Sequence, residues 1–215
     1  MAVLDRYRLI IFDLDGTLVD AYKAIEKSFN YTMKNLGYPR KNSLIIRRAV
    51  GWGDENLLKP FLKREDLKRA IYIYRKNHTK SLPRYSRLLP GVKKVLSYLK
   101  DKGYKLAIAS NRPTRFTKLL INHLNIERYL DFVLCADRLK NIKPHPGILI
   151  KIIKRLAVSR LNTLYVGDMV IDIQAGKNAK IDTIAVLTGS HSKKKLIRQK
   201  PLKVISNVEA LLNIL

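Results

Sequence analysis

Cysteine is almost absent from this sequence, because Cys135 is the only one among 215 residues. A chain with one cysteine forms no internal disulfide, which excludes the small secreted domains that such bonds hold together. Long apolar runs are also missing: Asp13 and Asp15 interrupt the first one, and none approaches the roughly 20 residues of a membrane span. We therefore expect a cytoplasmic protein without a membrane partner.

Acidic residues are the second shortage. The 43 Lys and Arg outnumber the 17 Asp and Glu, which gives a formal net charge of +26 at pH 7. This excess attracts polyanions, acidic surfaces and phosphorylated small molecules. Heat-adapted proteins pair their many lysines with glutamates, and glutamate is scarce here, so that interpretation is weak. Aspartates that gather in one place are correspondingly informative in this chain.

Aromatic residues are missing from the most basic segment, SHSKKKLIRQK at 190–200. Binding of single-stranded nucleic acid uses aromatic side chains interleaved with the positive charges. We therefore interpret this segment as a solvated surface. Nucleic acid is not an expected partner, beyond weak and salt-sensitive nonspecific binding through the basic surface.

Apolar residues make up 47% of the chain, enough for one core and a small second domain. From residue 92 onward, apolar strand patterns alternate with amphipathic helix patterns, which predicts an α/β fold with a doubly wound, Rossmann-like parallel sheet. The predicted strands are 9–12, 105–109, 131–135, 163–166, 183–187 and 203–205; the predicted helices are 92–102, 114–123, 146–156, 171–179 and 207–214.

A helical insertion follows the first predicted strand. Helical patterns cover 21–36, 45–50, 55–62 and 66–79, and no convincing strand lies between them. We predict a small helical cap domain at 19–83, inserted into a core domain formed by 1–18 and 84–215. Residues 18–20 and the predicted linker at 83–90 would be its two hinges.

Unusual polar residues follow the predicted strands. The first strand ends on Asp13 and Asp15, whose side chains point the same way on an extended segment. Ser110 and Asn111 follow the second strand, Lys143 comes after the third, and Asp168 and Asp172 follow the fourth. Ligand and catalytic sites of such sheets lie at the carboxyl ends of the strands. Crowded carboxylates need a proton or a cation between them, and Mg²⁺ prefers oxygen ligands.

These segments resemble, in order, the four motifs of the haloacid dehalogenase superfamily of phosphohydrolases. DLDGT at 13–17 is similar to the first motif, Ser110 to the second, Lys143 to the third and GDMVID at 167–172 to the fourth. The insertion resembles the helical cap of the subclass that contains phosphoglycolate phosphatases, and GWGDENLL at 51–58 is similar to the substrate loop of that cap. The resemblance covers nearly the whole chain.

The resemblance implies a two-step phosphoryl transfer with Mg²⁺ as cofactor. Asp13 would be the nucleophile that forms an aspartyl-phosphate, and Asp15 would act as the general acid and then the general base. The carboxylates of Asp13 and Asp168 and the backbone carbonyl of Asp15 would hold the metal. Ser110 would hydrogen-bond the phosphoryl oxygens, and Lys143 would neutralise their charge while holding Asp13 ionised.

Other residues would have supporting roles. Asp172 is expected in a second shell, where it orients Lys143 or a metal-bound water. Thr17 and Asn111 would support the phosphate pocket. Three residues of the predicted cap are candidates for contact with the substrate: Arg47, Arg48 and Trp52.

The motifs predict a Mg²⁺-dependent phosphomonoester phosphatase that acts on a small anionic metabolite such as 2-phosphoglycolate. Pyrophosphate hydrolysis and phosphosugar mutase activity are alternatives within the same fold. From another class, a basic nucleic-acid-binding or adaptor protein that retains the fold is the alternative. The sequence determines neither the phosphate ester nor the oligomeric state.

Overall fold

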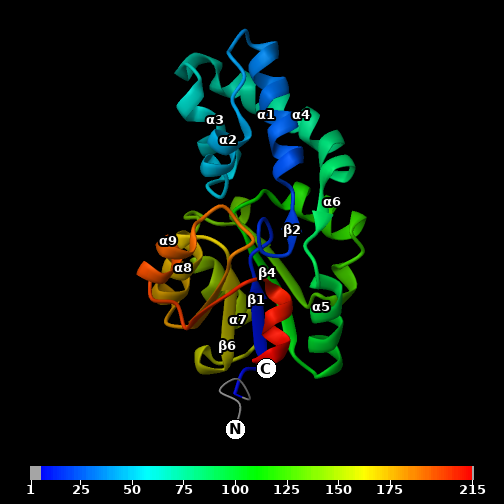
Figure 1. The fold of residues 1–215 in the computed structure, drawn as a ribbon, viewed down its shortest axis with the longest axis vertical. Coiled ribbons are helices and arrows are strands. Elements are labelled where there is room, and N and C mark those ends of the chain that lie inside the picture. The colour runs from blue at the N-terminus through cyan, green and yellow to red at the C-terminus, as the bar shows by residue number, and fades with distance from the viewer. Residues whose placement is uncertain (1–5, 215) are drawn as a thin grey trace.

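The computed structural model describes residues 6–214 and contains a six-stranded sheet in which all neighbouring strands run parallel (Figure 1). The strand order is β5-β4-β1-β6-β7-β8, which places β1 at the centre between β4 and β6. The strands are β1 (Leu9–Phe12), β4 (Lys105–Ser110), β5 (Phe132–Cys135), β6 (Thr163–Gly167), β7 (Asp182–Val186) and β8 (Lys203–Ile205).

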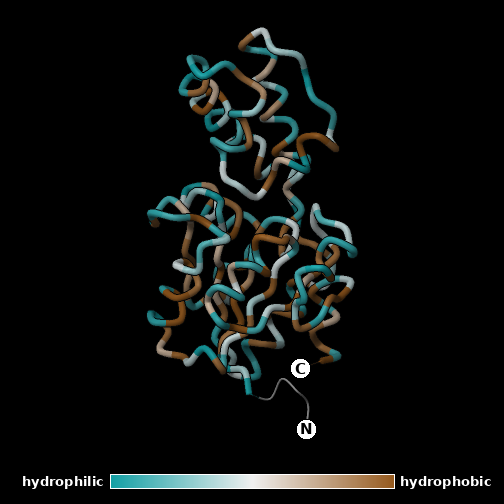
Figure 2. Tube along the Cα trace, turned by 90° about the vertical axis from the view of Figure 1, so that its left-hand side faces the viewer, coloured by the Kyte–Doolittle hydropathy of each residue, from teal (hydrophilic) through white to brown (hydrophobic). Residues whose placement is uncertain are grey.

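The sheet is buried on both faces because side chains along its central strand alternate between two cores. Ile10 and Phe12 belong to one apolar cluster, whereas Leu9 and Ile11 belong to another on the opposite face. All four residues are fully buried. This explains why β1 has a continuous apolar sequence. In Figure 2, hydrophobic segments of the chain run through the lower part of the molecule.

Helices cover both faces, which confirms the predicted doubly wound α/β architecture. Helices α5 (Val92–Asp101) and α6 (Thr114–His123) pack on one face, and α7 (Gly147–Arg155) and α8 (Val170–Ala179) on the other. The remaining helical segments of this part are α9 (Lys193–Arg198) and the 3₁₀ turns η3 (Glu127–Tyr129), η4 (Ala136–Arg138), η5 (Arg160–Asn162) and η6 (Val208–Asn213).

Between β1 and the rest of the sheet, the chain forms a group of helices beyond the carboxyl ends of the strands (Figures 1 and 2). The antiparallel pair β2 (Val19–Asp20) and β3 (Arg87–Leu88) carries the chain into this group and back. We call the segment between them, residues 21–86, the helical insertion. It contains α1 (Tyr22–Asn35), α2 (Ser43–Ala49), α3 (Gly53–Leu58), η1 (Lys59–Phe61), η2 (Arg64–Asp66) and α4 (Leu67–Tyr85). The division into domains at 19–83 stays a prediction.

Two local predictions were wrong. The segment at 83–90 is not a linker throughout, because α4 continues to Tyr85 with Pro83 inside its last turns. Proline removes one backbone hydrogen bond there, and the neighbouring Leu82 is fully buried in the core, which favours continuation of the helix. The basic side chains of the segment at 190–200 are exposed, which confirms the predicted solvated surface, while the segment forms α9 and Leu196 packs against Ile173 and Ala185. The last helix is the 3₁₀ turn η6, with bounds close to those predicted.

Within residues 6–214, no helix is both long enough and apolar enough to cross a membrane.

Candidate active site

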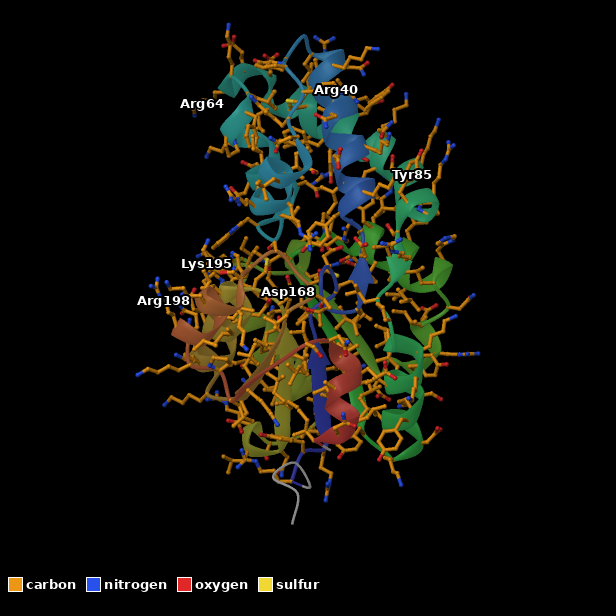
Figure 3. The ribbon with its side chains drawn as sticks, viewed as in Figure 1. Arg40, Arg64, Tyr85, Asp168, Lys195 and Arg198 are labelled. Carbon is orange, nitrogen blue, oxygen red and sulfur yellow. The ribbon has the colours of Figure 1, made fainter. Side chains whose placement is uncertain are left out.

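The polar residues that follow the central strands meet at one cavity. Because β1 lies between β4 and β6, the chain segments after these three strands are neighbours. Figure 3 labels Asp168, directly after β6, at the level between the sheet and the helical insertion. The cavity is lined from the sheet side by the residues Asp13, Asp15, Ser110, Asn111, Arg112, Lys143, Met169, Ile171 and Asp172, and from the insertion by Ile25, Val50, Gly51, Gly53, Asp54, Leu57 and Tyr74.

Lys143 is the centre of a buried network of hydrogen bonds, and its own side chain is only 2% exposed. Its Nζ lies 2.6 Å from Asp13 Oδ1 and 2.8 Å from Asp172 Oδ1. It also lies 2.9 Å from the Tyr165 hydroxyl oxygen and 3.0 Å from the Ala109 carbonyl oxygen. Burial disfavours the charged amine, but the two carboxylates outweigh it and raise the pKa of Lys143 above its usual value. The ammonium is therefore retained as a fixed positive charge beside Asp13.

Asp172 holds the Lys143 ammonium through a hydrogen bond and an ion pair. Its Oδ1 accepts the Tyr165 hydroxyl at 2.7 Å in addition to Lys143, and its Oδ2 accepts the Met169 backbone N–H at 2.9 Å at the start of α8. Both carboxylate oxygens are thus engaged by the protein. The predicted second-shell contact of Asp172 with Lys143 is present in the structure.

Asp13 extends the backbone of β1 by one residue, and its N–H donates to the Val166 carbonyl of β6 at 2.8 Å. Burial is the main influence on its carboxyl and raises the pKa of Asp13 to about 7, against the opposing effect of Lys143. Asp172 also raises this pKa. A carboxylate in such a position gains from an additional cation.

Asp168 is fully buried, and its carboxylate accepts hydrogen bonds from two uncharged donors. Thr17 Oγ1 donates to its Oδ1 at 3.2 Å, and the Ser190 backbone N–H lies 3.3 Å from its Oδ2. Burial and the nearby Asp13 raise the pKa of Asp168 well above its usual range. The backbone at Gly189 approaches the Asp168 carboxylate so closely that a Cβ there would lie 1.6 Å from Asp168 Oδ2. A Cβ at Gly16, whose φ is +85°, would lie 2.6 Å from the same oxygen.

These carboxylates fit a divalent metal ion. Among residues 6–214, oxygens of Asp13, Asp168 and Asp172 lie within 4.8 Å of one another. Asp172 is committed to Lys143, Tyr165 and the helix start, so Asp13 and Asp168 are the carboxylates best placed to coordinate a cation. An all-oxygen set of buried carboxylates suits Mg²⁺.

A stability measurement tests this fit. In chelator at pH 8, we expect Asp168→Asn to raise the free energy of unfolding by about 1–2 kcal/mol and Tm by about 5 °C. A carboxyl with a raised folded-state pKa costs stability as pH rises above its unfolded value near 4, so this gain should shrink toward pH 5. In thermal melts, Mg²⁺ should raise the Tm of the wild type and leave the Tm of the variant unchanged.

Asp101→Asn, which removes an exposed carboxylate, is the matched control. It should leave the Mg²⁺-dependent rise in Tm intact. A less stable Asp168→Asn protein in chelator at pH 8, or an unchanged response to Mg²⁺, would contradict the assignment of Asp168 to a cation site.

Arg112 is a site residue that the sequence reasoning missed. Its guanidinium binds the Asp15 carboxylate with two hydrogen bonds, from Nε to Oδ2 at 2.8 Å and from Nη2 to Oδ1 at 2.7 Å. The two side chains are 5% and 14% exposed. Arg112 directly follows Ser110 and Asn111, so its place in that segment was the available signal. In a chain with 43 basic residues, charge alone did not distinguish it.

Ser110, Asn111 and Thr17 all lie at the site. Ser110 is 2% exposed, and its Oγ accepts the Arg112 backbone N–H at 3.1 Å. Asn111 joins two loops, because its Oδ1 accepts the Lys143 N–H at 3.0 Å and its Nδ2 donates to the Gly51 carbonyl at 2.8 Å. Thr17 contacts Asp168 rather than the cavity.

The residues proposed for substrate contact in the insertion do not line this cavity. Arg47 donates to the Gly189 carbonyl at 2.9 Å and lies over the Tyr22 ring at 4.1 Å. Arg48 is exposed and borders a separate surface cavity with Lys195, and Trp52 is 40% exposed. The insertion instead presents Asp54, which Arg75 holds at 3.0 Å and which the sequence reasoning did not select.

Comparison with known proteins decides the family. The family model of haloacid dehalogenase-like hydrolases matches residues 10–186. The chain belongs to this hydrolase family. The matched range begins in β1 and ends with β7, so in this haloacid dehalogenase-like hydrolase it includes all the residues that line the cavity.

Curated relatives and solved structures agree with the family. This hydrolase is 33% identical over 182 residues to phosphoglycolate phosphatase of Aquifex aeolicus, covering 85% of each chain. It is 28% identical to that of Nitrosococcus oceani, covering 99% of this chain and 98% of the relative. The crystal structure of a "predicted phosphoglycolate phosphatase" from Haemophilus somnus superposes with a TM-score of 0.93 at 26% identity, covering 98% and 99% of the two chains.

Proposed function

We propose that this chain is a Mg²⁺-dependent phosphomonoester phosphatase that works through an aspartyl-phosphate intermediate. The observation that carries the proposal is the buried pair of Asp13 and Lys143 at 2.6 Å, which lines the cavity and lies close to the Asp168 carboxylate. A carboxylate held between two cationic positions is a suitable nucleophile for a dianionic phosphate ester. The family and the curated phosphatase relatives support the same reaction type.

In the proposed first step, a carboxylate oxygen of Asp13 bonds to phosphorus while the bond from phosphorus to the leaving oxygen breaks. Asp15, which lines the same cavity, gives a proton to that leaving oxygen. Lys143 and Ser110 stabilise the charge on the phosphoryl oxygens. Mg²⁺, when held by the carboxylates of Asp13 and Asp168 and the backbone carbonyl of Asp15, supplies further neutralisation of that charge.

In the second step, a water attacks phosphorus and the acyl-phosphate bond to Asp13 breaks. Asp15 now accepts the proton of the water, which restores its protonated form for the next turnover. The products are inorganic phosphate and the alcohol of the leaving group. The insertion covers the cavity with Tyr74 and Leu57, and its residues limit access of bulk water during the first step.

The proposed substrate is a small anionic phosphate ester similar to 2-phosphoglycolate. The names of the curated relatives support this choice. Lys143 and Arg112 are the two cations that line the cavity among the described residues, and both already contact carboxylates. A small substrate is favoured because side chains of the insertion line the same cavity as Asp13.

A panel of phosphate compounds tests the function. Purified protein is incubated with 2-phosphoglycolate, other small phosphomonoesters, pyrophosphate and glucose 1-phosphate, each with Mg²⁺ and with chelator. We expect phosphate release from a small monoester that depends on Mg²⁺ and stops in chelator. Release from pyrophosphate alone, or isomerisation of the sugar phosphate without release, would contradict the proposed phosphatase.

A further inference from the structure

We propose that Arg112 is a positioning residue for Asp15, and that His78 of helix α4 positions Arg112 in turn. The orientation of the acid and base of the reaction would then be set by the helical insertion. This inference rests on the proposed function, since it concerns the group that moves protons in both steps. It adds two residues that the catalytic motifs do not contain.

The contact between Arg112 and Asp15 fixes the carboxylate plane. Two parallel hydrogen bonds of 2.8 and 2.7 Å join the guanidinium fork to both carboxylate oxygens. Such a bidentate pair determines the orientation of a carboxylate, which a single point charge does not. Asp15 also lines the cavity, so the same bonds determine where its oxygens face the leaving group. Misplacement of a proton-transfer group by about 1 Å costs roughly 10²-fold in rate.

The remaining nitrogen of the Arg112 guanidinium, Nη1, contacts the helical insertion at His78. Arg112 Nη1 lies 2.8 Å from His78 Nε2, and His78 is completely buried in α4. A guanidinium only donates, so His78 Nε2 accepts and its proton is on Nδ1. His78 Nδ1 lies 3.0 Å from Ser28 Oγ, and Ser28 donates to the Ala24 carbonyl at 2.9 Å. Each donor has an acceptor along this chain from Arg112 through α4 to α1.

The histidine is held in place and stays neutral. Its ring stacks on Tyr74 with centroids 4.8 Å apart, and meets the edge of Phe116 of α6 at 5.0 Å. Burial, together with the positive charge of Arg112, lowers the pKa of His78 well below its usual value. A neutral imidazole keeps its acceptor at Nε2. Movement of α4 relative to the sheet would therefore displace Arg112 and change the position of Asp15.

The first test compares leaving groups. We expect Arg112→Ala to lower steady-state phosphate release from an alkyl monoester by roughly 10²-fold. With p-nitrophenyl phosphate, whose leaving group needs no proton, the first turnover should change only a few-fold. The second step still needs Asp15, so a burst of p-nitrophenol should precede slow turnover. Added guanidinium ion should restore part of the alkyl-ester activity, and Arg112→Lys should not match the wild type.

The second test uses a matched pair at His78. His78→Gln keeps an acceptor near the position of Nε2, whereas His78→Leu removes it. We expect His78→Leu to show the same leaving-group dependence as Arg112→Ala with about 10-fold loss, and His78→Gln to retain most of the rate. Arg138→Ala, at an exposed arginine outside the cavity, is the control and should leave both rates unchanged. Thermal melts establish that each variant is folded.

An equal loss of the first-turnover rate for alkyl and aryl esters, without guanidinium rescue, would show only a structural role and overturn the inference. If the wild type hydrolyses no phosphate ester, the proposed function fails while the positioning is still decided by NMR. The ¹⁵N signals of the Arg112 guanidinium and the ¹³C carboxyl signal of Asp15 should shift in His78→Leu and not in Arg138→Ala. Unchanged signals in His78→Leu would refute the link to the insertion.

Discussion

Asp13→Asn is expected to reduce phosphate release by about 10⁴-fold or more, because an amide oxygen is a poor nucleophile toward phosphorus. The substitution keeps the size of the side chain, so Lys143 Nζ retains an oxygen at the position now 2.6 Å away. Loss of activity would then reflect chemistry and not collapse of the site. Initial rates with the preferred ester and saturating Mg²⁺ measure the effect.

A trapping experiment identifies the intermediate. Denaturing quench after brief incubation with a ³²P-labelled ester should leave label on the wild-type protein and none on Asp13→Asn. Asp101→Asn, the same chemical change at an exposed position, should label like the wild type. Retention of more than a tenth of the wild-type rate by Asp13→Asn would rule out Asp13 as the nucleophile.

Lys143→Met is expected to lower both stability and activity. The substitution leaves Asp13 and Asp172 as buried carboxylates without the ammonium that lies 2.6 and 2.8 Å from them. Removing one partner of a buried ion pair costs about 3–5 kcal/mol, which corresponds to a decrease in Tm of about 10 °C. Phosphate release should fall by about 10³-fold, because the transferred phosphoryl group loses a fixed positive charge. Thermal melts and initial rates measure the two effects.

A double variant separates the two roles of this lysine. Adding Asp172→Asn to Lys143→Met removes one of the uncompensated buried charges, so stability should partly recover while activity stays low. Lys140→Met, at an exposed position in the same loop, should change neither quantity. Wild-type stability in the Lys143→Met protein would show that the buried carboxylates do not depend on Lys143.

The sequence predicted much of the fold because apolar periodicity is a local property. The helix at 114–123 and the strands at 9–12 and 203–205 have the predicted bounds, and the other four strands of the sheet differ by one residue at one or both ends. Tertiary contacts changed local expectations where packing outweighs propensity. Pro83 remains inside α4 because Leu82 is buried, and α9 forms in a segment where no helix was predicted because Leu196 is buried.

Arg112 and His78 illustrate what the sequence could not reveal. The two residues are 34 positions apart on different elements, and Asp15 is 97 positions from Arg112. The local signal for Arg112 was its position directly after Ser110 and Asn111, and nothing in the local pattern distinguishes His78 from the other histidines. Their significance depends on burial and on hydrogen-bond geometry, which arise only when α4 packs over the carboxyl ends of the strands.

The sequence by itself determined the parallel α/β architecture, the family resemblance and the chemical groups at the strand ends, because each depends on short-range order of residues. Only the tertiary structure decided which charged groups form ion pairs with one another. It placed Lys143 between Asp13 and Asp172, and it brought Asp168 close to both carboxylates. It also turned Arg47 toward the Gly189 carbonyl and Arg112 toward Asp15. Coulomb and desolvation energies depend on distance and burial in space, and neither quantity is a function of separation along the chain.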